Sequence, residues 1–226
     1  MGGLATGASS FSTFVQVLPR LPGVMRRMRP TWHMLALAAV TPAWLAEQGV
    51  RALLWDVDGT LTGDRQPTLA PESEAPFRKL LAAPELRHAM LSNAGEERYL
   101  QLGTMFPEMP ILRAYTLGSE VLYRRLRGRD DSWPTEQLQQ RLAAGARVVR
   151  KPSALLVEYA MRELGVTRGE MVMIGDQYMT DVAGANMAGV RSIKLPTLAR
   201  DTFRPAVRFS QALERGLYSV LYGHAI

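Results

Sequence analysis

Short apolar runs alternate with amphipathic stretches along the middle of the chain. Val50–Trp55 is an apolar run interrupted only by Arg51, which is typical of a buried parallel strand. Similar runs predict further strands at His88–Ser92, Glu170–Ile174 and Arg191–Leu195, and amphipathic stretches predict helices at Ala43–Gln48, Glu72–Ala83, Glu96–Leu102, from Ser153 onward and at Thr180–Met187. Strands that alternate with helices predict an α/β fold with a doubly wound, mostly parallel sheet.

Three segments fall outside this alternation. Residues 113–150 are predicted to form an irregular basic insertion that contains one helix, Thr135–Ala144. Residues 1–40 are predicted to form a basic N-terminal arm, and residues 199–226 a C-terminal helical tail. The α/β core is therefore expected to span residues 41–198, with the insertion inside it.

The composition fits a globular core and narrows the choice of metal. Of the 226 residues, 47% are hydrophobic and 21% charged, which is ordinary for a globular protein. The chain has no cysteine and only three histidines, His33, His88 and His224, no two of which are close in sequence. A zinc site is therefore not expected, and any metal should be a hard cation with oxygen ligands.

The net charge of +6 is unevenly distributed. Residues 1–46 carry four arginines and no acidic residue, and residues 113–151 carry a net charge of +5. Two basic regions indicate an anionic surface or substrate as the partner. The alternative is a solvated surface in a chain that prefers arginine, since arginines outnumber lysines 24 to 3.

The N-terminal residues bear on localisation. The longest nearly apolar stretch, Met34–Ala46, is well short of the roughly 20 residues that a transmembrane helix needs. Residues 1–30 are rich in small residues, hydroxyl residues and arginine, a composition shared by organelle transit peptides and by arms that bind membrane surfaces. The expected localisation is cytoplasmic, with or without peripheral attachment to an anionic membrane surface, and the mitochondrion is the alternative.

Two acidic residues follow the first predicted core strand. Asp56 and Asp58 are two positions apart, so both carboxylates are expected on the same side, and Gly59 lets the backbone approach a ligand closely. One carboxylate of such a pair can attack phosphorus while the other acts as general acid and base. The pattern also occurs in turns and calcium loops, but an EF-hand loop needs a glutamate about twelve positions on, and none stands there.

Further polar residues follow other predicted strands. Ser92 and Asn93 precede a helix, where a hydroxyl and backbone N–H groups can hold phosphoryl oxygens. Lys151 precedes another helix, and Asp176 and Asp181 follow the strand at 170–174. Each residue alone could be an ordinary helix cap or a surface charge. Their shared position at the carboxyl edge of a parallel sheet predicts one site, with Mg²⁺ bound by carboxylate oxygens.

In this order, the residues resemble the four motifs of the haloacid dehalogenase (HAD) superfamily. The resemblance implies a Rossmann-like fold, Mg²⁺ as cofactor, Asp56 as nucleophile and Asp58 as acid and base. It also implies phosphate contacts from Thr60, Ser92, Asn93 and Lys151, and metal contacts from Asp56, the Asp58 carbonyl, Asp176 and Asp181.

A closer resemblance links the chain to the YqeG-type branch, which includes mitochondrial phosphatidylglycerophosphatases. It covers most of residues 29–215 apart from the insertion, and rests on Thr41-Pro42 with Gly49, on Ser92-Asn93 with Glu96 and Arg98, on Gly175-Asp176-Gln177 with Thr180 and Asp181, and on Arg208-Phe209 with Glu214-Arg215. The branch usually has asparagine where this chain has Gly59 and Ala94. The resemblance implies a role in phospholipid metabolism.

The spacing of the motifs bears on the substrate. Only 33 residues separate Asp58 from Ser92, so a HAD core with a minimal cap or none, and an open site, is expected. An open site suits a phosphomonoester on a large carrier, such as phosphatidylglycerophosphate at a membrane. The alternatives are a soluble HAD phosphatase acting on a small phosphometabolite, and a non-catalytic HAD scaffold that binds anionic lipid or RNA. No nucleic-acid partner is expected, because only Trp133 interleaves the basic residues of 124–150.

Overall fold

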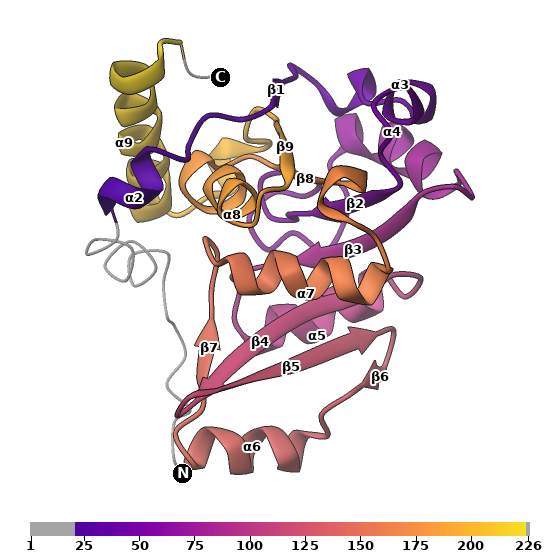
Figure 1. The fold of residues 1–226 in the computed structure, drawn as a ribbon, viewed down its shortest axis with the longest axis vertical. Helices are drawn as coiled ribbons and strands as arrows, with labels where there is room; N and C mark the ends of the chain where they lie inside the picture. Colours follow the sequence, from indigo (N-terminus) through magenta and orange to yellow (C-terminus); the bar gives the residue numbers. More distant parts are fainter. Residues whose placement is uncertain (1–20, 225–226) are drawn as a thin grey trace.

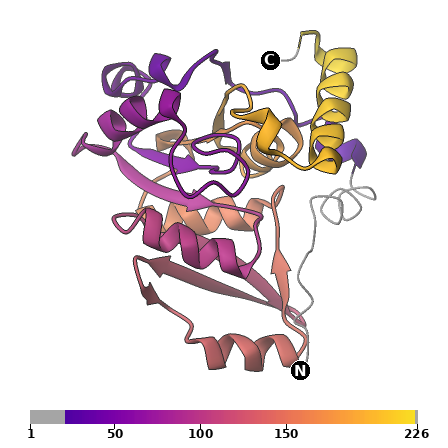
Figure 2. The same cartoon turned by 180° about the vertical axis from the view of Figure 1, so that it is seen from behind.

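The computed structural model describes residues 21–224, which form one nine-stranded sheet with helices on both faces (Figures 1 and 2). The strands are β1 (Trp32–His33), β2 (Ala52–Trp55), β3 (Arg87–Leu91), β4 (Ile111–Leu117), β5 (Glu120–Arg127), β6 (Asp130–Asp131), β7 (Arg147–Val149), β8 (Met171–Gly175) and β9 (Arg191–Lys194). The α-helices are α2 (Leu21–Met25), α3 (Pro42–Glu47), α4 (Pro71–Leu81), α5 (Glu96–Met105), α6 (Thr135–Ala143), α7 (Ala154–Leu164), α8 (Ala183–Met187) and α9 (Pro205–Tyr222).

The strand order is β1-β9-β8-β2-β3-β4-β5-β6, and β7 pairs with β4 off this path. From β1 to β4 every pairing is parallel, which confirms the predicted α/β class. Trp55 at the end of β2 lies beside Ile174 of β8, and the Asp56 N–H donates to the Ile174 carbonyl at 2.9 Å. The segments that follow β2 and β8 therefore leave the sheet side by side.

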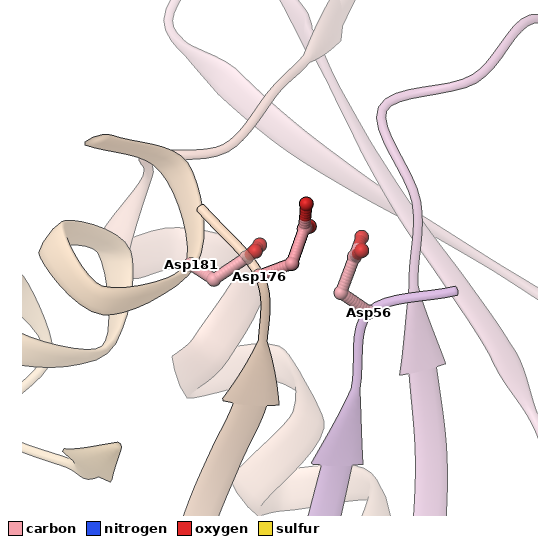
Figure 3. Close-up of side chains that lie close together, drawn as sticks. All are labelled: Asp56, Asp176 and Asp181. Carbon is pink, nitrogen blue, oxygen red and sulfur yellow. The ribbon is translucent and has the colours of Figure 1, made fainter. Parts of the chain in front are cut away.

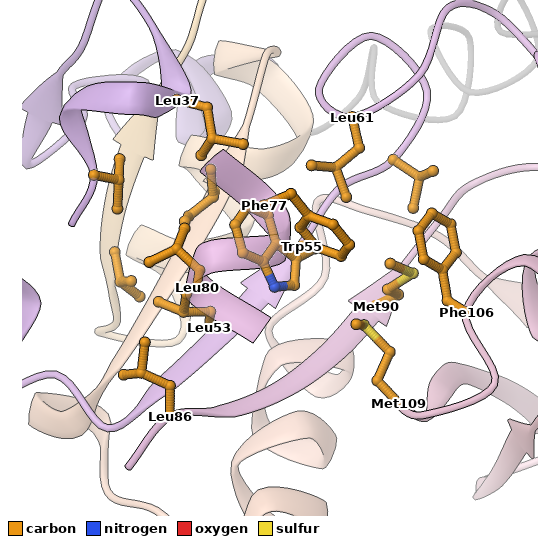
Figure 4. Packing of buried hydrophobic residues seen from close by; sticks show 14 of the residues in the cluster. Leu37, Leu53, Trp55, Leu61, Phe77, Leu80, Leu86, Met90, Phe106 and Met109 are labelled. Atoms are coloured by element: carbon orange, nitrogen blue, oxygen red, sulfur yellow. The ribbon is translucent and has the colours of Figure 1, made fainter. Parts of the chain in front are cut away.

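Strand β2 is buried on both faces, which explains its unbroken apolar sequence. Leu53 and Trp55 pack with Phe77 of α4 on one side, within the core cluster of Figure 4. Leu54 packs with Leu156 of α7 on the other side. Burying one large apolar side chain contributes about 1.5–3 kcal/mol, so both layers hold β2, and the residue that follows it, in place.

The prediction of an irregular insertion over residues 113–150 is wrong. Strand β4 pairs antiparallel with β5 along the whole of Ile111–Leu117, and β7 pairs with residues 114–116 beyond the end of β3. Helix α6, which confirms the helix predicted at Thr135–Ala144, packs through Leu138 against Tyr115 and Trp133. Residues 111–149 therefore extend the main sheet with antiparallel strands.

Buried arginines account for this error. Arg113 and Arg124 are 6% and 2% exposed and both form ion pairs with Glu96, at 2.9 and 2.7 Å. Arg124 also pairs with Asp131 at 2.5 Å, and both guanidinium groups lie over the ring of Tyr99. Paired arginines can occupy core positions of a strand, so part of the charge in this segment is neutralised inside the fold and does not face a partner.

Both terminal segments pack against the core. Strand β1 pairs with β9 at the edge of the sheet, so the described part of the predicted N-terminal arm belongs to the folded body. Helix α9, in the segment predicted as a helical tail, packs through Tyr218 against Val24 and Met28. Residues 1–20, which carry most of the predicted transit peptide or membrane arm, lie outside the described residues. No helix within 21–224 is long and apolar enough to cross a bilayer.

Candidate active site

Three acidic side chains converge at the carboxyl ends of β2 and β8 (Figure 3). Asp56 follows β2, Asp176 follows β8, and Asp181 lies in a π-helical turn, Tyr178–Val182, that leads into α8. Carboxylate oxygens of the three residues lie within 4.8 Å of one another, and the residues are 6%, 3% and 2% exposed. The helix predicted from Thr180 thus begins in a wider turn, a form often found at functional sites.

Lys151 neutralises part of this cluster. Its Nζ lies 2.5 Å from Asp56 Oδ1 and 2.6 Å from Asp181 Oδ1, and the residue is 4% exposed. Burial alone would lower the pKa of Lys151, but the carboxylates of Asp181 and Asp56 raise it above its usual value. The lysine therefore stays charged and can also offset the charge of a phosphate.

Of the three acidic residues, Asp176 makes the fewest hydrogen bonds and ion pairs with the protein. Both of its carboxylate oxygens are buried, and no hydrogen bond of good geometry within residues 21–224 reaches them, although the Thr197 side chain is close enough to favour the charged form. Burial and then the charge of Asp181 raise the pKa of Asp176 to about 7. Burial also raises the pKa of Asp56, against the opposing charge of Lys151. Buried carboxylates with free lone pairs suit a hard divalent cation, so Asp56 and Asp176 fit a metal between them.

The loop after β2 is shaped to fit this cluster. Gly59 has a φ of +96°, and a Cβ atom there would lie 2.7 Å from Asp176 Oδ2, so a side chain at this position would collide. The Thr60 hydroxyl donates to Asp56 Oδ2 at 3.1 Å. Thr60 therefore orients Asp56, and its contact with phosphate stays a prediction.

Asp58 is held by an arginine from another element. Arg98 of α5 donates to Asp58 Oδ1 at 2.7 Å, and its side chain is 2% exposed. The same oxygen accepts from the Thr62 hydroxyl at 3.3 Å and from the Arg65 backbone N–H at 3.1 Å. These bonds orient the carboxylate through one oxygen and leave Oδ2 for a substrate. Sequence reasoning included Arg98 only within a family resemblance, because one arginine in a helix carries no signal by itself.

Ser92 and Asn93 lie just after β3. The Ser92 hydroxyl oxygen accepts from the Ala94 N–H at 3.1 Å, which is an ordinary turn contact. The Asn93 side chain donates to the Lys151 carbonyl at 3.1 Å and accepts from the Lys151 N–H at 2.7 Å. Asn93 therefore fixes the backbone of Lys151, a role that the sequence did not reveal. Contacts of Ser92 and Asn93 with phosphate stay predictions.

Two further buried ionisable residues, Lys194 and Glu214, lie near Asp176. Lys194, at the end of β9, is 1% exposed, and burial lowers its pKa against the charge of Asp176. Glu214 of α9 accepts a short hydrogen bond from the Tyr178 N–H, and burial raises the pKa of Glu214 to about 7. The C-terminal helix thus contributes to the electrostatics of the site. Sequence periodicity could not reveal this, because Glu214 and Tyr178 are 36 residues apart.

The chain is similar to known phosphatases. A family model described as HAD-hydrolase-like matches residues 148–198, which include Lys151, Asp176 and Asp181. The protein named "Probable phosphatase YqeG" of Bacillus subtilis is 26% identical over 183 residues, 80% of this chain and 84% of that protein. The phospholysine phosphohistidine inorganic pyrophosphate phosphatase of Bos taurus is 34% identical over 101 residues. That alignment covers 44% of this chain and only 36% of the bovine protein.

Solved structures show weaker likenesses. An uncharacterized protein from Listeria monocytogenes serotype 4b has a TM-score of 0.41 at 20% identity, covering 65% of this chain and 78% of its own. A 4-nitrophenylphosphatase from Thermotoga maritima has a TM-score of 0.31 at 14% identity, covering 71% of this chain and 90% of its own. At these scores, the strand order itself defines the α/β fold of this chain.

Proposed function

We propose that this chain is a HAD-like phosphatase of the YqeG type, and that it hydrolyses phosphomonoesters through an aspartyl phosphate formed on Asp56. The observation that carries the proposal is the setting of Asp56 at the end of β2, with Lys151 at 2.5 Å and Thr60 at 3.1 Å. Both neighbours are donors, so the carboxylate is oriented before substrate arrives. A non-catalytic scaffold would not need a cluster of buried acids whose pKa values are raised, first by burial and then by the neighbouring charge of Asp181.

Two steps follow from the groups present. In the first, a carboxylate oxygen of Asp56 bonds to phosphorus, the bond from phosphorus to the ester oxygen breaks, and Asp58 protonates that leaving oxygen. In the second, Asp58 accepts a proton from water, the water oxygen bonds to phosphorus, and the bond to Asp56 breaks to release inorganic phosphate. Lys151 and Ser92 would hold the phosphoryl oxygens in both steps.

We propose Mg²⁺ as the cofactor. The Asp56 and Asp176 carboxylates and the Asp58 carbonyl would hold it. Asp181 already pairs with Lys151 and accepts from the Gln177 N–H at 3.0 Å, which suits a contact through water. When bound, the ion supplies charge stabilisation to the phosphoryl group.

The substrate that we propose is phosphatidylglycerophosphate or another phosphomonoester on a membrane lipid. Between Asp58 and Ser92 the chain forms only α4 and β3, and the strands between Ser92 and Lys151 join the main sheet. No separate cap domain within residues 21–224 would enclose a small substrate. A soluble phosphometabolite is the second candidate, favoured by the similarity to a phosphatase named for phospholysine, phosphohistidine and pyrophosphate.

Phosphate release tests these proposals. The full chain would be assayed on phosphatidylglycerophosphate in liposomes and on a panel of soluble phosphomonoesters, with Mg²⁺ and with a chelator. Asp56→Asn, which keeps the side-chain shape, is the control. We expect Mg²⁺-dependent release that is highest on the lipid and abolished in the variant. Release that survives in Asp56→Asn refutes the nucleophile, whereas a preference for soluble esters refutes the lipid substrate alone.

A further inference from the structure

Helix α9 exposes several large apolar residues and buries two polar ones. Phe209, Leu213 and Val220 lie on its outward face and are 71%, 39% and 85% exposed. Gln211 and Glu214 lie on its inward face and are 5% and 6% exposed. A helix on a water-facing surface normally has the opposite arrangement. The outward face is therefore expected to be covered by something other than water.

The outward face is apolar along most of the helix. Exposed residues recur every three or four positions as Ala206, Phe209, Leu213, Gly216 and Val220, and none of them has a polar side chain. This apolar stripe spans about 21 Å at 1.5 Å per residue. A contiguous stripe of this kind marks an interaction surface more clearly than scattered apolar residues do.

The orientation of the helix is fixed by its inward face. Glu214 accepts from the Tyr178 N–H, and the Tyr218 ring stacks on the Tyr178 ring with centroids 3.9 Å apart. The Tyr222 hydroxyl donates to the Met25 carbonyl at 2.6 Å. Rolling the helix to hide the apolar stripe would break these contacts and expose the buried glutamate. The contacts of the inward face therefore keep the apolar stripe exposed.

The surface beside the apolar stripe is basic. Helix α2 packs beside α9 at the outer edge of the molecule (Figures 1 and 2). Exposed arginines follow α2, precede α9 and lie within α9: Arg26, Arg27 and Arg29, then Arg204, and then Arg208. Residues 21–46 contain no acidic residue, and the single acidic residue of α9, Glu214, is buried. An apolar stripe flanked by arginines matches a helix that lies in the interface of an anionic bilayer.

We propose that α9 docks on an anionic lipid bilayer, with its apolar stripe toward the acyl chains and the neighbouring arginines among the headgroups. Pairing the same face with a second copy would bring the arginines of two chains together, so charge favours lipid. The inference deepens the proposed function and rests on it for the lipid substrate. Because Glu214 on the inward face contacts Tyr178, two residues from Asp176, docking holds the active site beside the bilayer.

Vesicle binding by the full chain tests this proposal. Co-sedimentation would compare vesicles of phosphatidylcholine alone with vesicles that also contain phosphatidylglycerol. The test variant is Phe209→Ser with Val220→Ser. The matched control is Leu142→Ser on α6, because Leu142 is 46% exposed and α6 lies far from α9 (Figure 1). Circular dichroism checks that each variant is folded, and release from 4-nitrophenyl phosphate reports the site without lipid.

We expect the wild type and Leu142→Ser to bind the anionic vesicles, and the α9 variant to bind them at least about tenfold more weakly. Release from 4-nitrophenyl phosphate should be unchanged in both, which separates a failure of docking from a failure of the phosphatase. Equal vesicle binding by the α9 variant, or equal binding to neutral vesicles, overturns the proposal. A wild-type dimer that the α9 variant cannot form, without any vesicle binding, assigns the surface to a second copy instead.

Discussion

Replacing Arg98 with methionine removes the charged partner of Asp58 while keeping most of the side-chain volume. The Arg98 guanidinium lies 2.7 Å from Asp58 Oδ1, and the arginine also donates to Gln101 Oε1 at 2.7 Å. Asp58 keeps its bonds to Thr62 and the Arg65 N–H in the variant. We therefore expect Asp58 to remain near the site but to lose its fixed orientation.

The expected losses of folding stability and of kcat in Arg98→Met follow from the burial of this ion pair. Removing one partner of a fully buried ion pair costs about 3–5 kcal/mol of folding stability. The Asp58 side chain is 17% exposed and water can replace part of the interaction, so we expect a loss of about 2–3 kcal/mol. A positioned general acid contributes roughly 10²–10⁴-fold to the rate. Because two of the three bonds to Asp58 Oδ1 remain, we expect kcat on an alkyl phosphate to fall about 10²-fold, near the lower end of that range.

The dependence on the leaving group distinguishes positioning of Asp58 from a general effect on folding. An alkoxide needs a proton as it leaves, whereas 4-nitrophenolate does not, so kcat of Arg98→Met on 4-nitrophenyl phosphate should fall less than about tenfold. Adding Arg98→Met to Asp58→Asn should cause no further loss on the alkyl ester. Arg78→Met is the control, because Arg78 is a 68% exposed side chain paired only within its own helix. Equal losses on both esters, or additive losses in the double variant, would refute the positioning role.

Three further predictions concern the same cluster. Gly59→Ala should lower kcat at least about tenfold, because the new Cβ atom would collide with Asp176. Gly145→Ala is the control: Gly145 has a similar φ of +95° but open space around it, so this variant should lose stability and keep its kcat. Equal kcat values in the two variants would contradict this prediction. Lys151→Met should destabilise the metal-free protein more at pH 8 than at pH 5. Burial raises the pKa of Asp56, so more of the charge that Lys151 offsets on this residue is present at the higher pH. An equal change in melting temperature at both pH values would argue against this prediction. The pKa of Asp176 is raised from 3.8 to about 7 in the fold, so its stabilising contribution is complete below about pH 4 and is lost as pH rises through about 7. The difference in free energy of unfolding between the metal-free protein and Asp176→Asn should therefore fall between about pH 4 and pH 7, and Mg²⁺ should suppress this fall. A difference that does not change with pH would disprove the raised pKa of Asp176.

Local patterns were sufficient to predict the four central parallel strands, β2, β3, β8 and β9. An apolar run such as Val50–Trp55 can be satisfied only by burial on both faces, and the residue after it must leave at the carboxyl edge. For this reason, the approach of Asp56 and Asp176 could be expected from sequence. The structure brings Lys151 to the same point, within 2.5 Å of Asp56.

Contacts between distant segments could not be predicted in the same way. The antiparallel extension was missed because its strands carry arginines at buried positions, and only the folded chain shows Glu96 and Asp131 beside them. The pairing of Arg98 with Asp58 spans 40 residues and leaves no periodic signal. The inverted polarity of α9 was also hidden, because a helical pattern alone does not say which face meets the protein.

Trapping the covalent intermediate is the most direct test of Asp56 as the nucleophile. The enzyme would be mixed with substrate and Mg²⁺, quenched in acid, reduced with borohydride and digested, because reduction converts an aspartyl phosphate to homoserine at the labelled position. Tandem mass spectrometry of two peptides identifies the modified residue: residues 52–65 contain Asp56, Asp58 and Asp64, and residues 169–191 contain Asp176 and Asp181. We expect homoserine at position 56 alone, and none in Asp56→Asn. Homoserine at position 58, 176 or 181, or phosphate release with no covalent intermediate at any time point, would contradict it.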